Sequence, residues 1–346
     1  MDKINKHNSI FLEDISSILN LNCNWLSLKE KTILITGGTG LIGTILIEMF
    51  CLLNKVYSLN LKLIIVSRKK HITDNSVIQY LVQNVNDPFD LKLPIDYIIH
   101  AASNTHPLQY SLEPIETITS NVFGTYNLLS LASKNNNCKM IFISSVEIYG
   151  NDISNNNSGF KEDDMGYLNC NTLRACYNES KRLSETLCQA FYSQKKVEFV
   201  IARLCRCYGP TLKKDDSKAL SQFLFNGIKK QDIILKSKGE QTYSYLYAAD
   251  AASAIIFLML NGVTGEAYNV SDKESVIKLK DLANLIAKNC NTKVIFDLPS
   301  ETESKGYSKS DIAILNSEKI NKLGWKAQFS LEEGIKRTLS ILKLDD

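Results

Sequence analysis

Short apolar runs alternate with longer amphipathic stretches through the first part of the chain. The run Thr32–Thr36 predicts a buried strand, and Leu41–Leu53 is apolar and long enough for a helix. The same criteria predict strands at Leu63–Val66, Ile95–His100, Lys139–Ser144 and Val197–Leu204, and helices at about 114–134 and at Arg174–Gln194. Strands that alternate with helices predict an α/β fold, with a doubly wound parallel sheet of the Rossmann type.

The pattern changes after Leu204, where the segments become shorter and mixed. Strands are expected near Ile233–Leu235 and Tyr243–Tyr247, and helices near 219–229, 249–260, 279–288 and 331–342. We therefore expect a main domain at 31–205 and a smaller mixed α/β lobe at 206–346, with segments that return to the main sheet. Residues 1–30 are expected to form an N-terminal helical extension.

Composition excludes several classes of protein. In 346 residues, Lys+Arg 40 against Asp+Glu 37 leaves a net charge of +3, without the basic surplus of a nucleic-acid binder. No apolar run approaches the roughly 18 residues that cross a bilayer, and the N-terminus lacks the apolar core of a signal peptide. Nine cysteines without framework spacing indicate reduced thiols, so we expect a cytoplasmic protein without a membrane anchor.

A close pair of cysteines, Cys205 and Cys207, is the one candidate for metal ligation that spacing suggests. It has no companion Cys-x-x-Cys motif and no histidine cluster nearby in the sequence. A zinc site needs about four such ligands. We expect no metal site.

A glycine-rich turn follows the first predicted strand directly. Gly37, Gly40 and Gly43 are spaced three apart and lead into a helix that starts with Leu41 and Ile42. Glycines allow a tight turn and a close backbone approach to a pyrophosphate, while the helix N-terminus offers N–H groups. The strand before and the helix after this turn predict a dinucleotide-binding site.

The end of the second strand bears on which dinucleotide is bound. An acid there would bind the ribose 2′-hydroxyl, whereas an arginine favours a 2′-phosphate. Here the strand closes with Ser67 and Arg68 and has no acid, which favours NADP over NAD. Arg68 could equally be one residue of a solvated basic run, 68–70. Asp87, in the loop before the strand predicted at Ile95–His100, is a candidate partner for the adenine amino group.

Two Tyr-x-x-x-Lys pairs occur, and their context separates them. Tyr177 and Lys181 lie one helical turn apart at the start of a long helix, after the long polar stretch Asn151–Asn171. Tyr192 and Lys196 lie at the far end of the same helix, and we interpret them as structural.

Together with the serines that end the preceding strand, Tyr177 and Lys181 suit the oxidation of a secondary alcohol. A tyrosine has a pKa of about 10, and a neighbouring ammonium group together with a cationic nicotinamide would lower that pKa enough to make a usable base. Lys181 can also hold the nicotinamide ribose. Ser145 can share the proton of the substrate hydroxyl, and Ser144 precedes it at the cofactor.

Seven segments together resemble extended short-chain dehydrogenases/reductases of the nucleotide-sugar epimerase, dehydratase and decarboxylase group. They read TGGTGLIG, HAAS (100–103), NVFGT (121–125), ISSVEIYG (143–150), RACYNESKRLSE (174–185), ARLCRCYGP (202–210) and YLYAADAASAI (245–255). The resemblance spans about residues 30–345. It implies that Ala101 and Ala102 line an NAD(P) cofactor bound by the domain 31–205, and that the lobe 206–346 holds a nucleotide-diphosphate sugar. It also implies a homodimer through the helices at about 114–134 and 174–194.

Departures from that family bear on the reaction. The 4,6-dehydratases place an Asp-Glu pair after the serine or threonine, and here those positions are Val146 and Glu147. The decarboxylases carry a serine or threonine with a glutamate, which Ser145 and Glu147 match. Yet an arginine of the substrate lobe is Tyr243 here, and an asparagine after the sixth strand is Arg206. Arg206 is thus a candidate cation for the substrate or merely a surface arginine, and Glu147 is a catalytic, substrate-binding or structural acid.

We therefore expect an enzyme that oxidises the sugar C4 hydroxyl with bound NAD(P). Dehydration requires a second acid, and decarboxylation requires a cation for the C6 carboxylate. Inversion at C4 requires neither, so the sequence favours a 4-epimerase. A 4,6-dehydratase or a uronate decarboxylase is the alternative, ahead of a C4 dehydrogenase/reductase or a non-catalytic cofactor-sensing protein.

Overall fold

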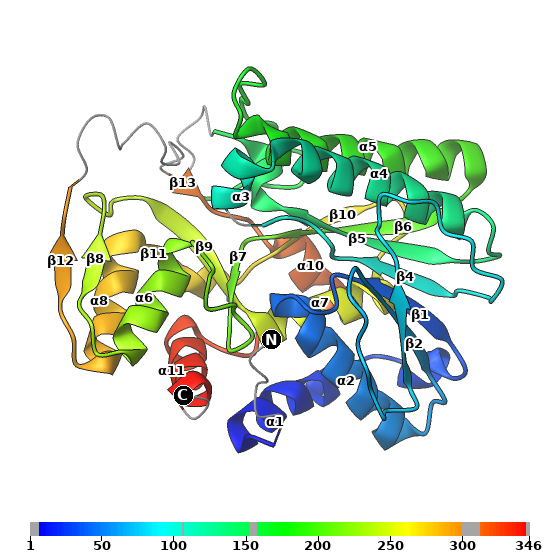
Figure 1. The fold of residues 1–346 in the computed structure, drawn as a ribbon, viewed down its shortest axis with the longest axis horizontal. Coiled ribbons are helices and arrows are strands. Elements are labelled where there is room, and N and C mark those ends of the chain that lie inside the picture. Colours follow the sequence, from blue (N-terminus) through cyan, green and yellow to red (C-terminus); the bar gives the residue numbers. More distant parts are fainter. Residues whose placement is uncertain (1–6, 106, 152–157, 299–311, 344–346) are drawn as a thin grey trace.

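The computed structural model describes residues 7–105, 107–151, 158–298 and 312–343. Within these ranges a seven-stranded sheet has the order β10-β6-β5-β4-β1-β2-β3, and every neighbouring pair is parallel. This confirms the doubly wound parallel sheet (Figure 1). The strands are β1 (Thr32–Thr36), β2 (Lys62–Ser67), β3 (Ile78–Val82), β4 (Tyr97–His100), β5 (Lys139–Ser145), β6 (Glu198–Leu204) and β10 (Ala267–Val270).

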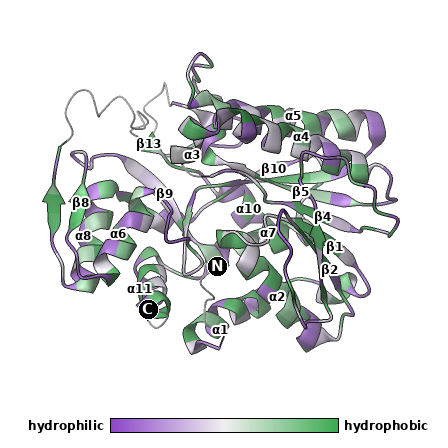
Figure 2. Ribbon diagram, in the orientation of Figure 1, coloured by the Kyte–Doolittle hydropathy of each residue, from purple (hydrophilic) through white to green (hydrophobic). Residues whose placement is uncertain are grey.

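Helices cover both faces of the sheet, so its central strands are mostly buried. All five residues of β1 are buried, as expected for a parallel strand that is covered on both sides. Figure 1 shows α4 (Pro114–Ala132) and α5 (Ala175–Lys195) side by side on one face. On the other lie α2 (Leu41–Tyr57) and α7 (Ala248–Asn261), which contact each other. Figure 2 shows the strands and the inner helix faces in green, the hydrophobic end of its scale.

Two strands of this sheet have no counterpart among the predicted ranges. The edge strand β3 keeps all five of its residues at least partly exposed, so it lacks a continuous apolar run. At the opposite edge, β10 is only four residues long and contains the fully buried Asn269. A polar residue inside a short strand hides the apolar pattern. The side-chain amide of Asn269 donates to the carbonyl oxygens of Phe160 (2.8 Å) and Asn316 (3.1 Å), which satisfies it in the interior.

We call the elements after β6, apart from α7 and β10 of the main sheet, the smaller lobe; its first strand, β7, starts at Arg206. A second sheet joins β11, β9 and β13 in that order, and β7 also pairs with β9. Catalytic chemistry in open α/β sheets gathers at the carboxyl ends of the strands, which here face this lobe. The elements of the lobe are β7 (Arg206–Tyr208), α6 (Ala219–Ile228), β8 (Ile233–Leu235), β9 (Thr242–Tyr247), β11 (Val276–Lys278), α8 (Leu279–Cys290), β12 (Val294–Phe296), β13 (Ile312–Ala313), α10 (Glu318–Leu323) and α11 (Leu331–Lys343).

The N-terminal segment contains α1 (Ser9–Ser16) and packs against both α2 and α11. Asp14 of α1 is buried and accepts a hydrogen bond from Arg337 Nε at 2.6 Å and another from the hydroxyl of Tyr247. Burial raises the pKa of the Asp14 carboxyl. The Asp14 carboxylate thus connects α1 with α11 and with the last residue of β9. None of the helices in the described ranges combines the length and apolarity that crossing a membrane requires.

Asp14 and Glu13 both contact Arg337, but the side chain of Glu13 is 65% exposed and that of Asp14 only 1%. Asp14→Ala should lower the free energy of unfolding by about 3 kcal/mol or more, because it strands a guanidinium and a tyrosine hydroxyl in the interior. Glu13→Ala should cost about 1 kcal/mol or less. Chemical denaturation of both variants measures the difference. Equal losses would show that the buried contact contributes no more than the exposed one.

Candidate active site

The glycine turn and the end of β4 lie against each other. Gly37 has φ +72°, and a Cβ there would lie 2.7 Å from the carbonyl of Ala101 and from the backbone nitrogen of Ala102. A Cβ on Gly43 would lie 2.2 Å from the carbonyl oxygen of Gly37. Only glycine fits both positions, so the turn brings the start of α2 close to the Ala101–Ala102 peptide.

The residues of this cradle fit a dinucleotide. Gly40 is the N-cap of α2 and no side chain caps the helix, so the N–H groups of its first turn, which includes Leu41 and Ile42, are available to a pyrophosphate. The hydroxyl of Ser144 is buried at the end of β5 without a hydrogen-bond partner among the described residues. A buried unpaired hydroxyl at this edge suits a polar cofactor.

Beneath the cradle, a buried pair of side chains fixes the end of β4. The backbone N–H of Ala102 donates to Thr36 Oγ1 at 3.1 Å, and Thr36 Oγ1 lies 2.8 Å from Nδ1 of His100. The direction of the hydrogen bond between Thr36 and His100 follows the tautomer of the histidine ring. Burial lowers the pKa of His100 to about 3. His100 is therefore a neutral structural residue of the cofactor cradle, which the sequence did not single out.

Tyr177, Lys181 and Ser145 come together between α5 and the end of β5. Ser145 makes a side-chain hydrogen bond with Tyr177, and the Tyr177 ring lies 6.0 Å from the Lys181 ammonium. The Lys181 ammonium donates to the carbonyl of Ile143 at 2.7 Å. Burial lowers the pKa of Lys181 to about 7 and raises the pKa of Tyr177 above its usual range. This arrangement can move a proton between the tyrosine and a substrate hydroxyl.

A charged cluster surrounds Glu147 in η3 (Val146–Tyr149), the short 3-10 helix after Ser145. Glu147 Oε2 accepts a hydrogen bond from Arg174 at 3.2 Å, and Oε1 lies 3.7 Å from Arg206 Nη2. The Arg206 guanidinium stacks on the Tyr243 ring, with its carbon 3.5 Å from the ring centroid. Arg206 Nη1 is buried without a partner in the described part of the chain. Two guanidinium groups therefore face one carboxylate, and a donor is left over.

Two side chains of this site went unrecognised in the sequence. Tyr110, in α3 (Pro107–Leu112), stacks on Tyr177 with ring centroids 4.8 Å apart. No motif marks it, since α3 lies far from α5 in the sequence. Arg174 could have been found from its spacing, because it precedes Tyr177 by three residues and so lies on the same face of the helix start.

The comparisons with known proteins identify the family. The sequence pattern of the NAD dependent epimerase/dehydratase family matches residues 33–271, well over half of the chain. The chain belongs to this family. It is 29% identical to UDP-glucuronic acid decarboxylase 1 of Arabidopsis thaliana over 321 residues, which cover 90% of this chain and 70% of that protein. The protein of the same name from Xenopus tropicalis is 28% identical, with 91% and 73% covered.

Solved structures of the epimerase/dehydratase family share the fold. UDP-glucose 4-epimerase of Thermotoga maritima, solved with UDP-glucose, superposes with a TM-score of 0.76 at 20% identity, covering 90% of this chain and 99% of that one. dTDP-glucose 4,6-dehydratase of Bacillus anthracis, solved with NAD, gives a TM-score of 0.73 at 19% identity, covering 90% and 96%. The chain is thus an NAD-dependent enzyme of nucleotide-sugar modification.

Other predicted residues of this family member lie away from the cluster. Arg68, just after β2, and Asp87, beyond β3, are both exposed. At the far end of α5, the Tyr192 ring is 40% exposed and Lys196 forms the C-cap. Of the long stretch Asn151–Asn171, residues 152–157 lie outside the described residues.

Tyr177→Phe should leave cofactor binding near normal and lower turnover by about 10²–10⁴, the usual scale for a lost acid–base group. Tyr192→Phe is the matched control and should change neither quantity. Steady-state kinetics and cofactor titration measure both. Equal losses from the two substitutions would mean that Tyr177 is not the base.

Proposed function

We propose that this protein is a decarboxylase of nucleotide-linked uronic acids that first oxidises the sugar C4 hydroxyl. The observation that carries the proposal is the Arg206 guanidinium, which lies beside Glu147 with one buried, unpartnered N–H donor. A planar guanidinium is the side chain best suited to bind a carboxylate. The relatives named UDP-glucuronic acid decarboxylase support the same substrate class.

The sequence favoured a 4-epimerase because Tyr243 replaces the arginine expected to hold a charged C6. That reason loses its force, since the Arg206 guanidinium stacks on the Tyr243 ring and brings a cation to the same place. Dehydration has less support, because Val146 is buried and apolar where the second acid would stand. C4 inversion needs only Ser145, Tyr177 and room for the sugar to turn, so it is the second candidate.

The residues of the site would divide the reaction as follows. When bound, a nicotinamide would supply the acceptor for the C4 hydride and the donor that reduces the ketone again. Tyr177, with Lys181 beside it, takes the C4 hydroxyl proton while Ser145 orients that hydroxyl. The resulting 4-keto acid breaks its C5–C6 bond, carbon dioxide leaves, and the electron pair passes to an enolate at C4–C5. Arg206 holds the carboxylate before that bond breaks. A proton from solvent would then add at C5, and Tyr177 would return its proton to the C4 oxygen as the ketone is reduced.

A panel of UDP-, dTDP-, GDP- and CDP-sugars, with uronic acids included, tests this function. With UDP-glucuronic acid we expect a product lighter by one carbon dioxide, identified by mass spectrometry. Arg206→Ala should lower kcat/KM for the uronic acid by about 10- to 100-fold, the scale for a hydrogen bond to a charged group. An isomer of unchanged mass from a neutral sugar would favour the 4-epimerase instead. Loss of water would indicate a dehydratase, and net consumption of NAD(P) a C4 dehydrogenase or reductase.

For the cofactor, we propose that the enzyme prefers NADP to NAD through Arg68, which is exposed at the end of β2. Arg68→Ala should weaken NADP binding by about 1.5–3 kcal/mol and leave NAD binding nearly unchanged. Lys70→Ala, which alters the same exposed basic run two residues later, is the control. Calorimetric titration of both dinucleotides measures the effect. Tighter binding of NAD than of NADP by the wild type would reverse the interpretation.

We propose that the protein is a homodimer and that α4 and α5 pair with a second copy. The two helices pack on each other, and each leaves large apolar side chains exposed. In α4, Phe123 is 54% and Tyr126 52% exposed; in α5, Leu183 is 48% exposed. Sedimentation of the wild type and of Tyr126→Glu tests this, because a charge on that face should shift a dimer toward monomer.

We also propose a cytoplasmic location. Cys188 and Cys205 are thiols buried in the core, outside any disulfide. Reduced thiols persist in the cytosol and are uncommon in secreted proteins.

A further inference from the structure

Side chains on successive turns of α5 form hydrogen bonds with successive residues of η3. The Asn178 amide donates to the carbonyl oxygen of Glu147 at 2.7 Å. One turn later, Arg182 Nε donates to the carbonyl oxygen of Ile148 at 2.6 Å. Successive turns of the helix thus bind successive carbonyls of the short helix.

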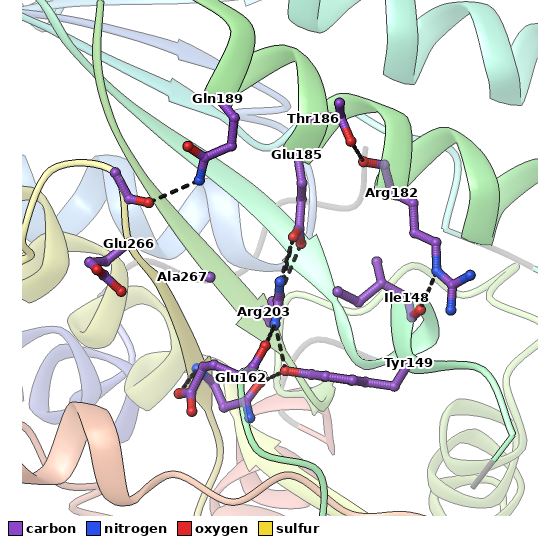
Figure 3. A network of polar contacts seen from close by, with 12 residues as sticks. Ile148, Tyr149, Glu162, Arg182, Glu185, Thr186, Gln189, Arg203, Glu266 and Ala267 are labelled. Carbon is purple, nitrogen blue, oxygen red and sulfur yellow. Dashed lines mark hydrogen bonds and ion pairs between the residues drawn. The ribbon is translucent and has the colours of Figure 1, made fainter. Parts of the chain in front are cut away.

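Glu185 forms the next contact through a buried arginine (Figure 3). Arg203 of β6 donates from Nη2 to Glu185 Oε2 at 2.7 Å and from Nη1 to the hydroxyl of Tyr149 at 2.8 Å. Tyr149 is the last residue of η3, and its hydroxyl donates onward to Asn269 at 2.7 Å. Glu185, Arg203 and Tyr149 are all buried, so their charges and hydroxyl depend on one another for partners.

The spacing of these three contacts matches one face of a helix. Residues 178, 182 and 185 follow each other at intervals of four and three, which aligns them along α5. Tyr177 and Lys181 immediately precede Asn178 and Arg182 in the sequence. On the other side of the contact, η3 begins directly after Ser145 and contains Glu147. The two segments held together are therefore the two that carry the proposed catalytic groups.

A separate support is needed here because η3 is weak by itself. It spans four residues, and 3-10 helices of this length have poor internal hydrogen bonds. Gly150 follows η3 as its C-cap, and its φ of +72° changes the direction of the backbone. Arg182 also binds a segment beside Gly150, since its Nη2 donates to the carbonyl oxygen of Gly166 at 3.0 Å. Residues 167 and 151 pair across the same turn.

We propose that Arg182 and Tyr149 are positioning residues that keep the Ser145–Glu147 segment in register with Tyr177 and Lys181. Neither acts on the substrate: Arg182 binds two carbonyl oxygens, and Tyr149 is stacked on Phe160 inside the protein, with centroids 4.7 Å apart. The effect on turnover rests on the proposed catalytic roles. The effect on the backbone of η3 does not.

Hydrogen exchange of the ligand-free protein, followed by mass spectrometry, tests the structural part. Arg182→Met and Tyr149→Phe should speed amide exchange in peptides that cover residues 145–151, while strand β1 keeps its protection. Glu179→Gln is the matched control: it removes the Arg182–Glu179 ion pair at 3.7 Å and leaves both carbonyl contacts in place. Unchanged exchange in 145–151 for both variants would overturn the proposal, whatever reaction the enzyme performs.

Kinetics on whichever substrate the wild type accepts test the functional part. Arg182→Met should lower kcat by about 10- to 100-fold, the scale for a displaced catalytic group, with KM changed far less. Arg182→Lys, which keeps one donor, should recover part of the rate, and Glu179→Gln should match the wild type.

The effect of Arg182→Met should shrink when Ser145→Ala is already present, because the positioned hydroxyl is then gone. A full additive loss, or a rise in KM alone, would contradict positioning through this segment.

Discussion

The buried ammonium group of Lys181 is the constraint on which the site depends. Only 2% of this residue is exposed, and desolvation lowers its pKa to about 7. The ammonium is held by the carbonyl of Ile143 and lies 4.7 Å from the centre of the Phe142 ring. An unfolded lysine keeps its proton up to a pH of about 10.4. Below pH 7 the folded chain thus carries the full cost of a buried charge. Between pH about 7 and about 10.4 the unfolded lysine keeps its proton while the folded one has lost it. The cost to the folded chain therefore falls as pH rises through this range.

Desolvation acts on the proposed base, Tyr177, as well. Burial raises the pKa of Tyr177 above its usual range, and the hydrogen bond with Ser145 opposes that rise only in part. The free protein therefore holds a neutral phenol beside a lysine that is only partly charged near neutral pH. A cationic nicotinamide would favour the phenolate by charge attraction. In the proposed mechanism, Tyr177 would become a base only with the cofactor bound, which would limit proton transfer to the assembled complex.

The sequence was sufficient to predict those elements whose structure is determined by neighbouring residues in the chain. The all-buried pattern of β1, the glycines at 37 and 43, and the start of α5 each follow from neighbours within a few residues. The family resemblance depended on the same segments, so the sheet, the dinucleotide cradle and the Ser145–Tyr177–Lys181 set could be predicted. The edge strand β3 and the Asn269-containing β10 could not, since their stability comes from partners elsewhere in the chain. Tyr110 belongs to the same class, because it reaches Tyr177 only through the fold.

The Arg206–Tyr243 pair shows how such long-range information enters a site. In the parallel pairing of β7 with β9, Arg206 lies opposite Tyr245, and Tyr243 is two residues away on the same face. A guanidinium on β7 can therefore cover a ring on β9 without any change in strand register. Read singly, each position suggests a lost function: an arginine replaced by tyrosine, and an asparagine replaced by arginine. Read together across the sheet, they place one guanidinium on a tyrosine ring and beside Glu147. In the proposed decarboxylase, the cation for the substrate carboxylate would therefore come from β7 instead of β9.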